Sequence, residues 1–265
     1  MAGFEYDLEA AAKLAEVLEK YELKFPKSTV NKLAKYCDLL WFWNTKLNLT
    51  RHTDFEKFVS RDLVDSIAVA EFLEPNERIL DVGTGGGVPG VILAIIRPDL
   101  QVELCDSTGK KANAVAEIVR SLKLEVPVWN AKAETLMQSR RYTTLVIRAV
   151  AKMSKLLEIF APCWQSFERL ILVKGPNWVA ERGESRHLGQ MNNLALRVLK
   201  SYPIPDQPET ADQIESVVLQ VCQKSKFSNI ADQIRTSLET KPQVKEKKED
   251  RKPRVRFPFR KKRDR

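Results

Sequence analysis

The sequence contains few of the side chains from which metal centres and disulfide frameworks are built. Only two histidines and four cysteines are present, and no two cysteines form a C-x-x-C pair. This scarcity excludes the usual zinc and iron–sulfur spacings, so we predict no metal ion. We interpret Cys37, Cys105, Cys163 and Cys222 as reduced thiols that pack in the interior rather than as disulfides.

Long hydrophobic runs are missing as well. The longest, Val91 to Ile96, ends at Arg97-Pro98 and is far too short to span a bilayer. Residues 1–23 carry acidic side chains and helical periodicity, so they resemble neither a signal peptide nor an Arg-rich transit peptide. We therefore expect a cytoplasmic protein without a membrane partner, and a monomer is the simplest oligomeric state.

Most of the chain lacks a charge excess, although the formal net charge is +9. Residues 241–265 contain 13 Lys and Arg against 4 Asp and Glu, which leaves 31 of each sign in residues 1–240. Any electrostatic preference for RNA must therefore come from this tail or from a local patch. Our hypothesis is that the tail binds RNA phosphates without sequence specificity. A purely solubilising tail is the alternative.

Glycine is scarce except in one loop. Five of the ten glycines lie within residues 83–90 of the stretch "DVGTGGGVPG", between a strand-like and a helix-like segment. A phosphate-binding P-loop is excluded because Val91-Ile92 follows Gly90 where Lys-Ser/Thr is required. Gly85, Gly87 and Gly90 also fit a dinucleotide fingerprint. The frame that begins with Asp81 and Gly83 fits S-adenosylmethionine, which has no pyrophosphate to place at the helix N-terminus.

Two acidic residues bear on this choice. Asp106 ends the next strand-like run and can accept hydrogen bonds from both ribose hydroxyls, which suits either cofactor. Asp81 precedes the glycines and can bind the amino group of the methionine part, so it favours S-adenosylmethionine.

The chain divides into three parts by pattern. Residues 1–75 are predicted to be helical, with Leu8, Ala11, Ala12, Ala15 and Leu18 on one face and Ser28 capping a second helix. Residues 76–226 alternate strands and helices, which predicts a parallel sheet. Two final strand-like runs, 194–204 and 215–224, favour a terminal antiparallel hairpin. Residues 227–265 form a polar extension whose tail, 241–265, we predict to be disordered when free.

Five parallel strands followed by a reversed hairpin predict an α/β fold. The arrangement suits the Rossmann-like sheet of class I S-adenosylmethionine-dependent methyltransferases, preceded here by an N-terminal helical segment, better than a dehydrogenase with six parallel strands.

Seven segments occur in an order typical of one family. They are "WNTKLNLT" (43–50), "RDLVDSIAVA" (61–70), "ILDVGTGGGVPGVILAIIRPD" (79–99), "LCDSTGKK" (104–111), "AKAETL" (131–136), "VIRAVA" (146–151) and "LILVKG" (170–175). With them the chain resembles the bacterial ribosomal RNA small subunit methyltransferase G family, also called glucose-inhibited division protein B, whose members methylate N7 of a guanine in 16S ribosomal RNA.

The resemblance implies a set of cofactor-binding residues and a partner. The S-adenosylmethionine contacts would fall on Gly83, Val88, Asp106, Ser107, Thr108, Ala133, Glu134 and Arg148. Arg148 could pair with the methionine carboxylate or with an RNA phosphate. The implied partner is 16S rRNA or the small ribosomal subunit. The chain departs from the family at Asp62, where a histidine is usual, and at Gly86, where a proline is usual.

Methylation of guanine N7 would explain the absence of an obvious catalytic motif. N7 carries a lone pair and no proton, so no general base is required and positioning suffices. We therefore predict no catalytic residue, with Arg148 as the single candidate. A non-catalytic RNA-binding or ribosome-assembly factor on the same fold is the alternative, and a nicotinamide-dependent oxidoreductase is a third class.

Several other side chains are weaker candidates for substrate contact. Asn44 and Asn48 could share a face for base recognition or serve in turns, and Lys174 could face the substrate or extend to solvent from a strand end. Trp178 is the candidate for stacking on a base. Cys163 could in principle act as a nucleophile, but we interpret it as a core residue.

Overall fold

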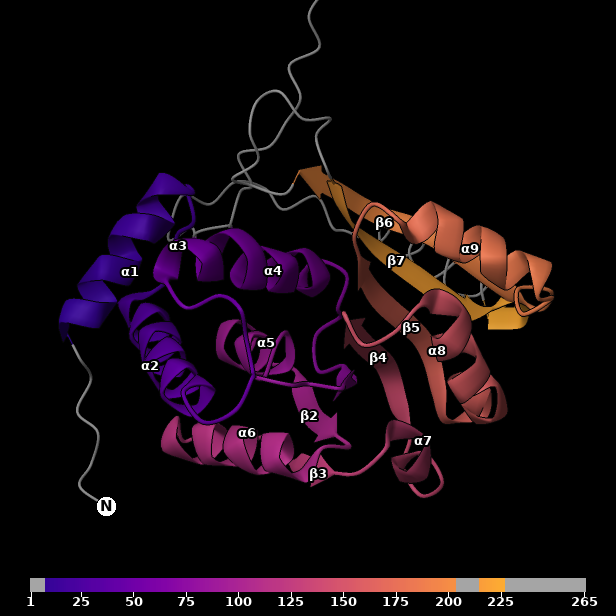
Figure 1. The fold of residues 1–265 in the computed structure, drawn as a ribbon, viewed down its shortest axis with the longest axis horizontal. Helices are drawn as coiled ribbons and strands as arrows, with labels where there is room; N and C mark the ends of the chain where they lie inside the picture. Colours follow the sequence, from indigo (N-terminus) through magenta and orange to yellow (C-terminus); the bar gives the residue numbers. More distant parts are fainter. Residues whose placement is uncertain (1–7, 204–214, 227–265) are drawn as a thin grey trace, which may run out of the picture.

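A single mixed sheet forms the centre of the molecule, with helices on both faces (Figure 1). The computed structural model describes residues 8–203 and 215–226. The strands are β1 (Arg78–Val82), β2 (Gln101–Asp106), β3 (Val128–Asn130), β4 (Tyr142–Arg148), β5 (Phe167–Lys174), β6 (Leu194–Pro203) and β7 (Glu215–Gln223). Their order across the sheet is β3-β2-β1-β4-β5-β7-β6.

The directions of the strands confirm the predicted fold class. Strands β1 to β5 run parallel, each reached through a helical crossover. Strand β7 is antiparallel to both β5 and β6, so the last two strands form the expected hairpin at the edge of the sheet. This is the Rossmann-like α/β sheet of class I methyltransferases with its terminal antiparallel hairpin.

The helices divide between the two faces. On one face lie α1 (Leu8–Lys20), α2 (Lys27–Asn44), α3 (Phe55–Lys57), the π-helical turn η1 (Phe58–Leu63), α4 (Val64–Ala70), α5 (Gly90–Ile96) and α6 (Gly109–Ser121). On the other lie α7 (Ala133–Leu136), α8 (Met153–Phe160), the 3-10 turn η2 (Ala161–Ser166) and α9 (Trp178–His187). None of the described helices is both long and apolar enough to cross a membrane.

Successive apolar side chains along the parallel strands point to opposite faces of the sheet, which explains why helices cover both faces. Ile79 of β1 packs into the cluster beneath the N-terminal helices, and its neighbour Leu80 packs into the cluster beneath α8. Val146 and Ile147 of β4 divide in the same way. Successive side chains on a strand point to opposite faces, so an apolar strand requires helices on both sides.

Three details of the helical prediction were wrong. Helix α1 buries Ala10, Ala11, Leu14 and Leu18, whereas Leu8 is 69% exposed and Ala12 and Ala15 also face outward. Ser28 lies inside α2, because that helix already begins at Lys27 after Pro26. Residues 61–73, whose apolar pattern predicts a third helix, belong to a helical run that begins earlier, at Phe55, where the side chain of Asp54 accepts a hydrogen bond from Lys57 N at 2.7 Å.

Other features lay beyond the sequence prediction. The turn η1 interrupts the continuous helix from Phe55 to Ala70, and α7 and α9 fall where no helix was expected. The connection 204–214 and the extension 227–265, with its basic tail, lie outside the described residues. The boundary at residue 75 stays a prediction, although α2 and α4 bury their apolar side chains in the same cluster as the sheet.

The fold brings the motif residues to one edge of the sheet. Gly83 follows β1, Asp106 ends β2, Ala133 follows β3, Arg148 ends β4 and Lys174 ends β5. Because all five strands are parallel, these positions share the carboxyl edge, where open α/β sheets bind their ligands.

Candidate functional site

The glycine loop after β1 is held from inside by Asp81. One carboxylate oxygen of Asp81, Oδ2, accepts hydrogen bonds from Thr84 Oγ1 at 2.6 Å and from Gly90 N at 2.9 Å. Burial raises the pKa of Asp81 to about 6, although both hydrogen bonds oppose that rise. The carboxylate therefore organises the loop. It lines neither of the two cavities beside the loop, in contrast to the role predicted from its position before the glycines.

Three glycines of the loop adopt backbone conformations that other residues rarely adopt. The φ angles of Gly83, Gly85 and Gly87 are +65°, +56° and +100°. A Cβ atom on Gly83 would lie 2.7 Å from Cγ2 of Val150, in the loop that follows β4. The chain can thus approach other groups closely at Gly83, which is the residue that both neighbouring cavities share.

The first cavity, which we call the Asp106 cavity, has a volume of about 360 Å³. Of the predicted cofactor residues, Gly83, Asp106, Ser107, Ala133 and Glu134 line it. The carboxylate of Asp106 is 7% exposed and accepts hydrogen bonds from Gly85 N at 3.0 Å and Thr108 N at 2.8 Å. Thr108 itself is exposed before α6 and lines neither cavity, so its contact with the site is made through its backbone.

The second cavity, the Arg148 cavity, is larger, at about 830 Å³. Val88 and Arg148 line it together with Gly83 and with residues of the N-terminal helical part. Ala149, the next residue after Arg148, has φ +54°, an uncommon value for a residue with a Cβ. The predicted cofactor residues therefore fall around two adjoining cavities that meet at the glycine loop.

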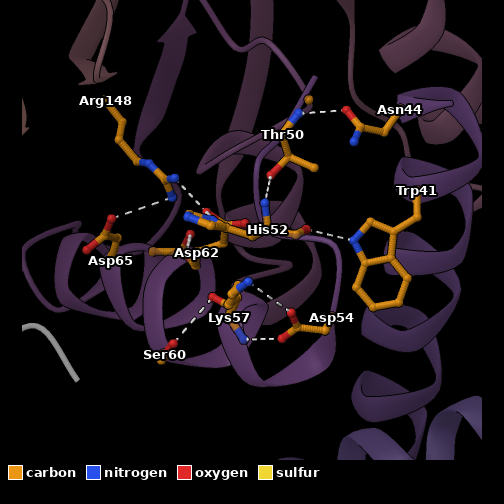
Figure 2. Close-up of polar contacts among 12 residues, drawn as sticks. Trp41, Asn44, Thr50, His52, Asp54, Lys57, Ser60, Asp62, Asp65 and Arg148 are labelled. Carbon is orange, nitrogen blue, oxygen red and sulfur yellow. Dashed lines mark hydrogen bonds and ion pairs between the residues drawn. The ribbon is translucent and has the colours of Figure 1, made fainter. Parts of the chain in front are cut away.

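Arg148 is the cationic centre of the second cavity. Its Nη2 donates to Oδ1 of Asp62 at 2.5 Å, and its Nη1 lies 3.5 Å from Oδ2 of Asp65 (Figure 2). Burial alone would lower the pKa of the guanidinium, but the two carboxylates raise it. Nη1 has no hydrogen-bond partner among the residues that the structure describes. Arg148 is therefore charged, and its buried Nη1 makes no hydrogen bond beyond the longer ion-pair contact with Asp65.

Sequence reasoning missed the histidine beside this arginine. His52 Nδ1 lies 2.9 Å from the same Asp62 Oδ1, and the backbone of His52 is fixed on both sides. Its carbonyl accepts from Trp41 Nε1 at 2.8 Å, and its N–H donates to Thr50 Oγ1 at 3.0 Å. The available signal was the pair of acids, Asp62 and Asp65, three residues apart beside the apolar Leu63 and Val64.

The asparagine and lysine candidates for substrate contact differ in their surroundings. Asn44 Oδ1 accepts from Leu49 N at 2.8 Å and Thr50 N at 3.0 Å, so Asn44 fixes a turn, whereas the exposed Asn48 lines the Arg148 cavity. Lys174 Nζ is tied to Ala151 O at 2.6 Å and to Glu181 at 2.8 Å.

The two remaining candidates, Trp178 and Cys163, pack against the hydrophobic cluster that lies between the sheet and α8. Trp178 is only half-buried, but the guanidinium of Arg182 lies over its ring, 5.2 Å from the centroid. Cys163 is in η2 and lines neither cavity, and burial raises the pKa of its thiol. Both positions agree with packing roles.

A local cationic patch is present even though the body of the chain is neutral. Arg51, Arg61 and Lys111 line the Arg148 cavity together with Arg148 itself. Arg148 is compensated by two buried acids, but the structure gives no ion pair for the other three cations among the described residues. The rim of this cavity is therefore suited to an anionic ligand.

Comparison with known proteins identifies the family. The family model described as rRNA small subunit methyltransferase G matches residues 29–205, a span that contains both cavities. The chain belongs to the rRNA small subunit methyltransferase G family. A member from Rhodopirellula baltica is 41% identical over 227 residues, which cover 81% of this chain and 98% of that protein. A member from Thermotoga maritima is 30% identical over 207 residues, or 77% and 86% of the two chains.

Solved structures resemble the chain more distantly. The TrmK protein of M. capricolum, crystallised in complex with S-adenosyl-homocysteine, has 14% sequence identity and a TM-score of 0.46. The alignment covers 60% of this chain and 67% of that chain. A likeness at this level adds nothing to the conclusion drawn from the family.

Positions 62 and 86, where we expect departures from the family pattern on the basis of the sequence, have well-defined structural surroundings. At position 62 the side chain is a carboxylate that contacts both His52 and Arg148, so a histidine still reaches this place, but from residue 52. At position 86, a Cβ on the glycine would lie 2.7 Å from Cδ1 of Leu40. The carbonyl of Gly86 accepts a hydrogen bond from the buried Tyr36 hydroxyl at 2.9 Å, so helix α2 packs closely against the loop.

Proposed function

We propose that this chain is an S-adenosylmethionine-dependent methyltransferase that methylates N7 of a guanine in 16S ribosomal RNA. The observation that carries the proposal is that a member of the rRNA small subunit methyltransferase G family has its glycine loop between two adjoining cavities at the carboxyl edge of the sheet. We further propose that it acts as a cytoplasmic monomer on the small-subunit RNA.

The two cavities fit the two ends of the cofactor. The Asp106 cavity offers a buried carboxylate for ribose hydroxyls and the backbone of Ala133 and Glu134 for the adenine edge. The Arg148 cavity offers a guanidinium whose buried Nη1 makes no hydrogen bond among the described residues and has only a 3.5 Å ion-pair contact with Asp65 Oδ2. A carboxylate is the natural acceptor for that donor. Gly83, which lines both cavities, would lie beside the middle of the cofactor.

The remaining predicted residues take supporting places in this proposal. Val88 lines the Arg148 cavity and Ser107 lines the Asp106 cavity, where their side chains shape the walls. Thr108 would act through its N–H, which holds the Asp106 carboxylate in place. These assignments are supported by the positions of the residues around the two cavities.

The chemistry requires little from the side chains beyond placement. When bound, S-adenosylmethionine supplies the methyl group as an electrophile on a positively charged sulfur. Guanine N7 presents a lone pair and no proton, so the new bond releases no proton and needs no general base. The protein must exclude water and hold N7 in line with the methyl group, and effective positioning of this kind accounts for large rate enhancements. We assign no residue as an acid or base.

The cationic rim of the Arg148 cavity supports RNA as the acceptor. Arg51, Arg61 and Lys111 line the cavity next to the place of the methyl donor. Phosphate contacts of this kind position a nucleic acid without reading its sequence. The guanine would then enter the Arg148 cavity from the side of the N-terminal helical part.

The deciding experiment measures methyl transfer to purified small-subunit RNA, followed by mapping of the modified base. Transfer to N7 of one guanine is expected, and modification of a pyrimidine or of an exocyclic amine would contradict the proposal. Calorimetric titration with S-adenosylhomocysteine and with NAD is the control. Binding of the former without transfer to any RNA substrate would favour the non-catalytic RNA-binding factor, whereas binding of NAD alone would favour the oxidoreductase.

A further inference from the structure

The walls of the Arg148 cavity include two buried polar atoms that lack a hydrogen bond among the described residues, and one of them, Arg148 Nη1, has only a 3.5 Å ion-pair contact with Asp65 Oδ2. Asp62 Oδ2 and Arg148 Nη1 are buried and have no hydrogen-bond partner among the described residues. Both residues line the cavity. The other halves of the same groups are already joined, because Arg148 Nη2 donates to Asp62 Oδ1 at 2.5 Å (Figure 2). An unused acceptor and an unused donor therefore lie on two groups that touch.

The charges of these groups define what would satisfy them. Burial would raise the pKa of Asp62, but the hydrogen bond with His52 and the charge of Arg148 outweigh it, so the pKa is lowered and the group is ionised at neutral pH. A buried carboxylate oxygen without a donor is costly, and more so when it is charged. Asp62 Oδ2 thus calls for a cationic donor, and Arg148 Nη1 for an anionic acceptor.

His52 decides which oxygen of Asp62 stays available. Its Nδ1 contacts Oδ1, the oxygen that Arg148 also uses. The backbone of His52 is held by Trp41 and Thr50, which places the ring beside Asp62, and the ring contact that results is to Oδ1 rather than to Oδ2. Two protein groups therefore converge on one oxygen of the carboxylate and leave the other for a ligand.

An α-amino acid group carries an ammonium and a carboxylate on the same carbon, which matches this pair of opposite charges. We infer that Asp62 binds the α-ammonium group of the amino-acid end of S-adenosylmethionine, next to Arg148, which binds its carboxylate. The inference rests on the proposed function. It gives position 62, where this chain departs from its family, a direct role in cofactor binding.

Asp81 is the competing candidate, because its Oδ1 is also buried and unpartnered among the described residues. Unlike Asp62, however, Asp81 lines neither cavity, and the Oδ2 atom of the same carboxyl holds Thr84 and Gly90 inside the loop. Asp81 therefore supports the glycine loop from inside, and its carboxylate contacts the loop instead of facing a ligand cavity.

Calorimetry with two ligands tests the inference on the full-length chain without measuring methyl transfer. The ligands are S-adenosylhomocysteine and its deamino analogue, 5′-S-(3-carboxypropyl)-5′-thioadenosine, which keeps the carboxylate but lacks the ammonium. The proteins are the wild type, Asp62→Asn and Asp81→Asn. Asp62→Asn is nearly isosteric and removes the charge that the ammonium would meet. The deamino analogue reports whether the rest of the site is intact in each variant.

The expected result is a selective loss. Asp62→Asn should weaken binding of S-adenosylhomocysteine about tenfold or more, the usual size for a missing hydrogen bond between charged groups, and should change binding of the deamino analogue less than about twofold. Asp81→Asn should weaken binding of both ligands to the same extent, because the Asp81 carboxylate holds the glycine loop in place.

Three results would overturn the inference while the proposed function stands. Asp62→Asn could weaken both ligands equally, which would make Asp62 a structural support of Arg148. It could leave both affinities unchanged. Alternatively, Asp81→Asn could be the variant that discriminates between the ligands, which would assign the ammonium to Asp81. Failure of the wild type to bind S-adenosylhomocysteine at all would instead contradict the proposed function, and this inference with it.

Discussion

At the scale of single residues, the site depends on two buried carboxylates, Asp62 and Asp81, whose different neighbours give them different pKa values. Asp62 and Asp81 are each 1% exposed. A histidine and an arginine meet the Asp62 carboxylate and lower its pKa, whereas Asp81 meets only a hydroxyl and a backbone N–H, so burial raises its pKa to about 6. Asp62 is therefore suited to bind a cation, and Asp81 to hold a loop.

The raised pKa of Asp81 predicts a specific dependence of stability on pH. Because the folded state holds the Asp81 proton more tightly than the unfolded state, with its ordinary value of 3.8, the contribution is present below pH 4 and is lost as pH rises through about 6. The free energy of unfolding of the wild type, minus that of Asp81→Asn, should fall by roughly 2.5 kcal/mol between pH 4 and pH 7. Urea unfolding of both proteins at each pH measures this difference. All other carboxylates cancel in it, and a difference that does not vary with pH would contradict the prediction.

Gly83 allows a second prediction at this scale, with Gly175 as its matched control. Both glycines directly follow strands, but Gly83 has φ +65° and a Cβ there would lie 2.7 Å from Val150, whereas a Cβ on Gly175 would meet nothing within 4 Å. Gly83→Ala should lower the free energy of unfolding by about 1–2 kcal/mol and should weaken binding of S-adenosylhomocysteine. Gly175→Ala should change neither quantity. Urea unfolding and calorimetry test both variants, and equal effects of the two substitutions would refute this account of the loop.

At the scale of elements, the segment between β4 and α8 is held by helix α9. Lys174 at the end of β5 donates to Ala151 O at 2.6 Å and pairs with Glu181 of α9 at 2.8 Å. The same Glu181 accepts from Met153 N, the first residue of α8, at 2.8 Å. This segment carries Arg148 at its start and Val150 over the glycine loop. Helix α9 thus contributes to the site without lining it.

Removal of Glu181 should therefore loosen the start of α8. We expect Glu181→Ala to accelerate hydrogen exchange of the Met153 amide about tenfold or more, because that amide loses its acceptor. Glu184→Ala is the control, since Glu184 of the same helix reaches this segment only through side chains among the contacts described, the Ser154 hydroxyl at 3.1 Å and Lys152 Nζ at 4.0 Å, and so leaves the Met153 amide its acceptor. Hydrogen exchange followed by mass spectrometry of peptides from 149–156 makes the measurement. Equal protection in the two variants would show that α9 does not hold this segment.

At the scale of the whole molecule, the sequence predicted what is contiguous and missed what the fold assembles. The glycine loop, Asp106 and the order of the strands could be predicted because each is a short local pattern. The cluster joins Arg148 to His52 and Asp62, which lie far from it in the sequence, and a π-helical turn that no periodicity indicated carries Asp62. Such turns are often found at functional sites, but they have no clear sequence signal.

The distribution of charge also becomes interpretable only for the whole molecule. Residues 1–240 are formally neutral, yet Arg51, Arg61 and Lys111 gather at one cavity, so the fold creates a cationic patch that a count of charges does not reveal. By our hypothesis, the excess of +9 in residues 241–265 would be a second, separate source of attraction for RNA. The two sources should differ in their effect, because the patch adjoins the place of methyl transfer and the tail is a sequence extension beyond the family match.

Truncation after Thr240 separates these two sources. If the tail binds phosphates, the truncated chain should bind small-subunit RNA more weakly, and the slope of log affinity against log salt should become shallower by roughly 0.7 for each phosphate that the tail neutralises. The affinity for S-adenosylhomocysteine should stay the same, because both cavities lie within the described residues before the tail. Replacing Arg51 and Lys111 by Gln in the full-length chain is the complementary variant. This double variant should lower the rate of methyl transfer, whereas the part of the slope of log affinity against log salt that comes from the tail should persist. Fluorescence anisotropy over a series of salt concentrations measures both slopes, and an unchanged slope after truncation would leave the tail with a solubilising role only.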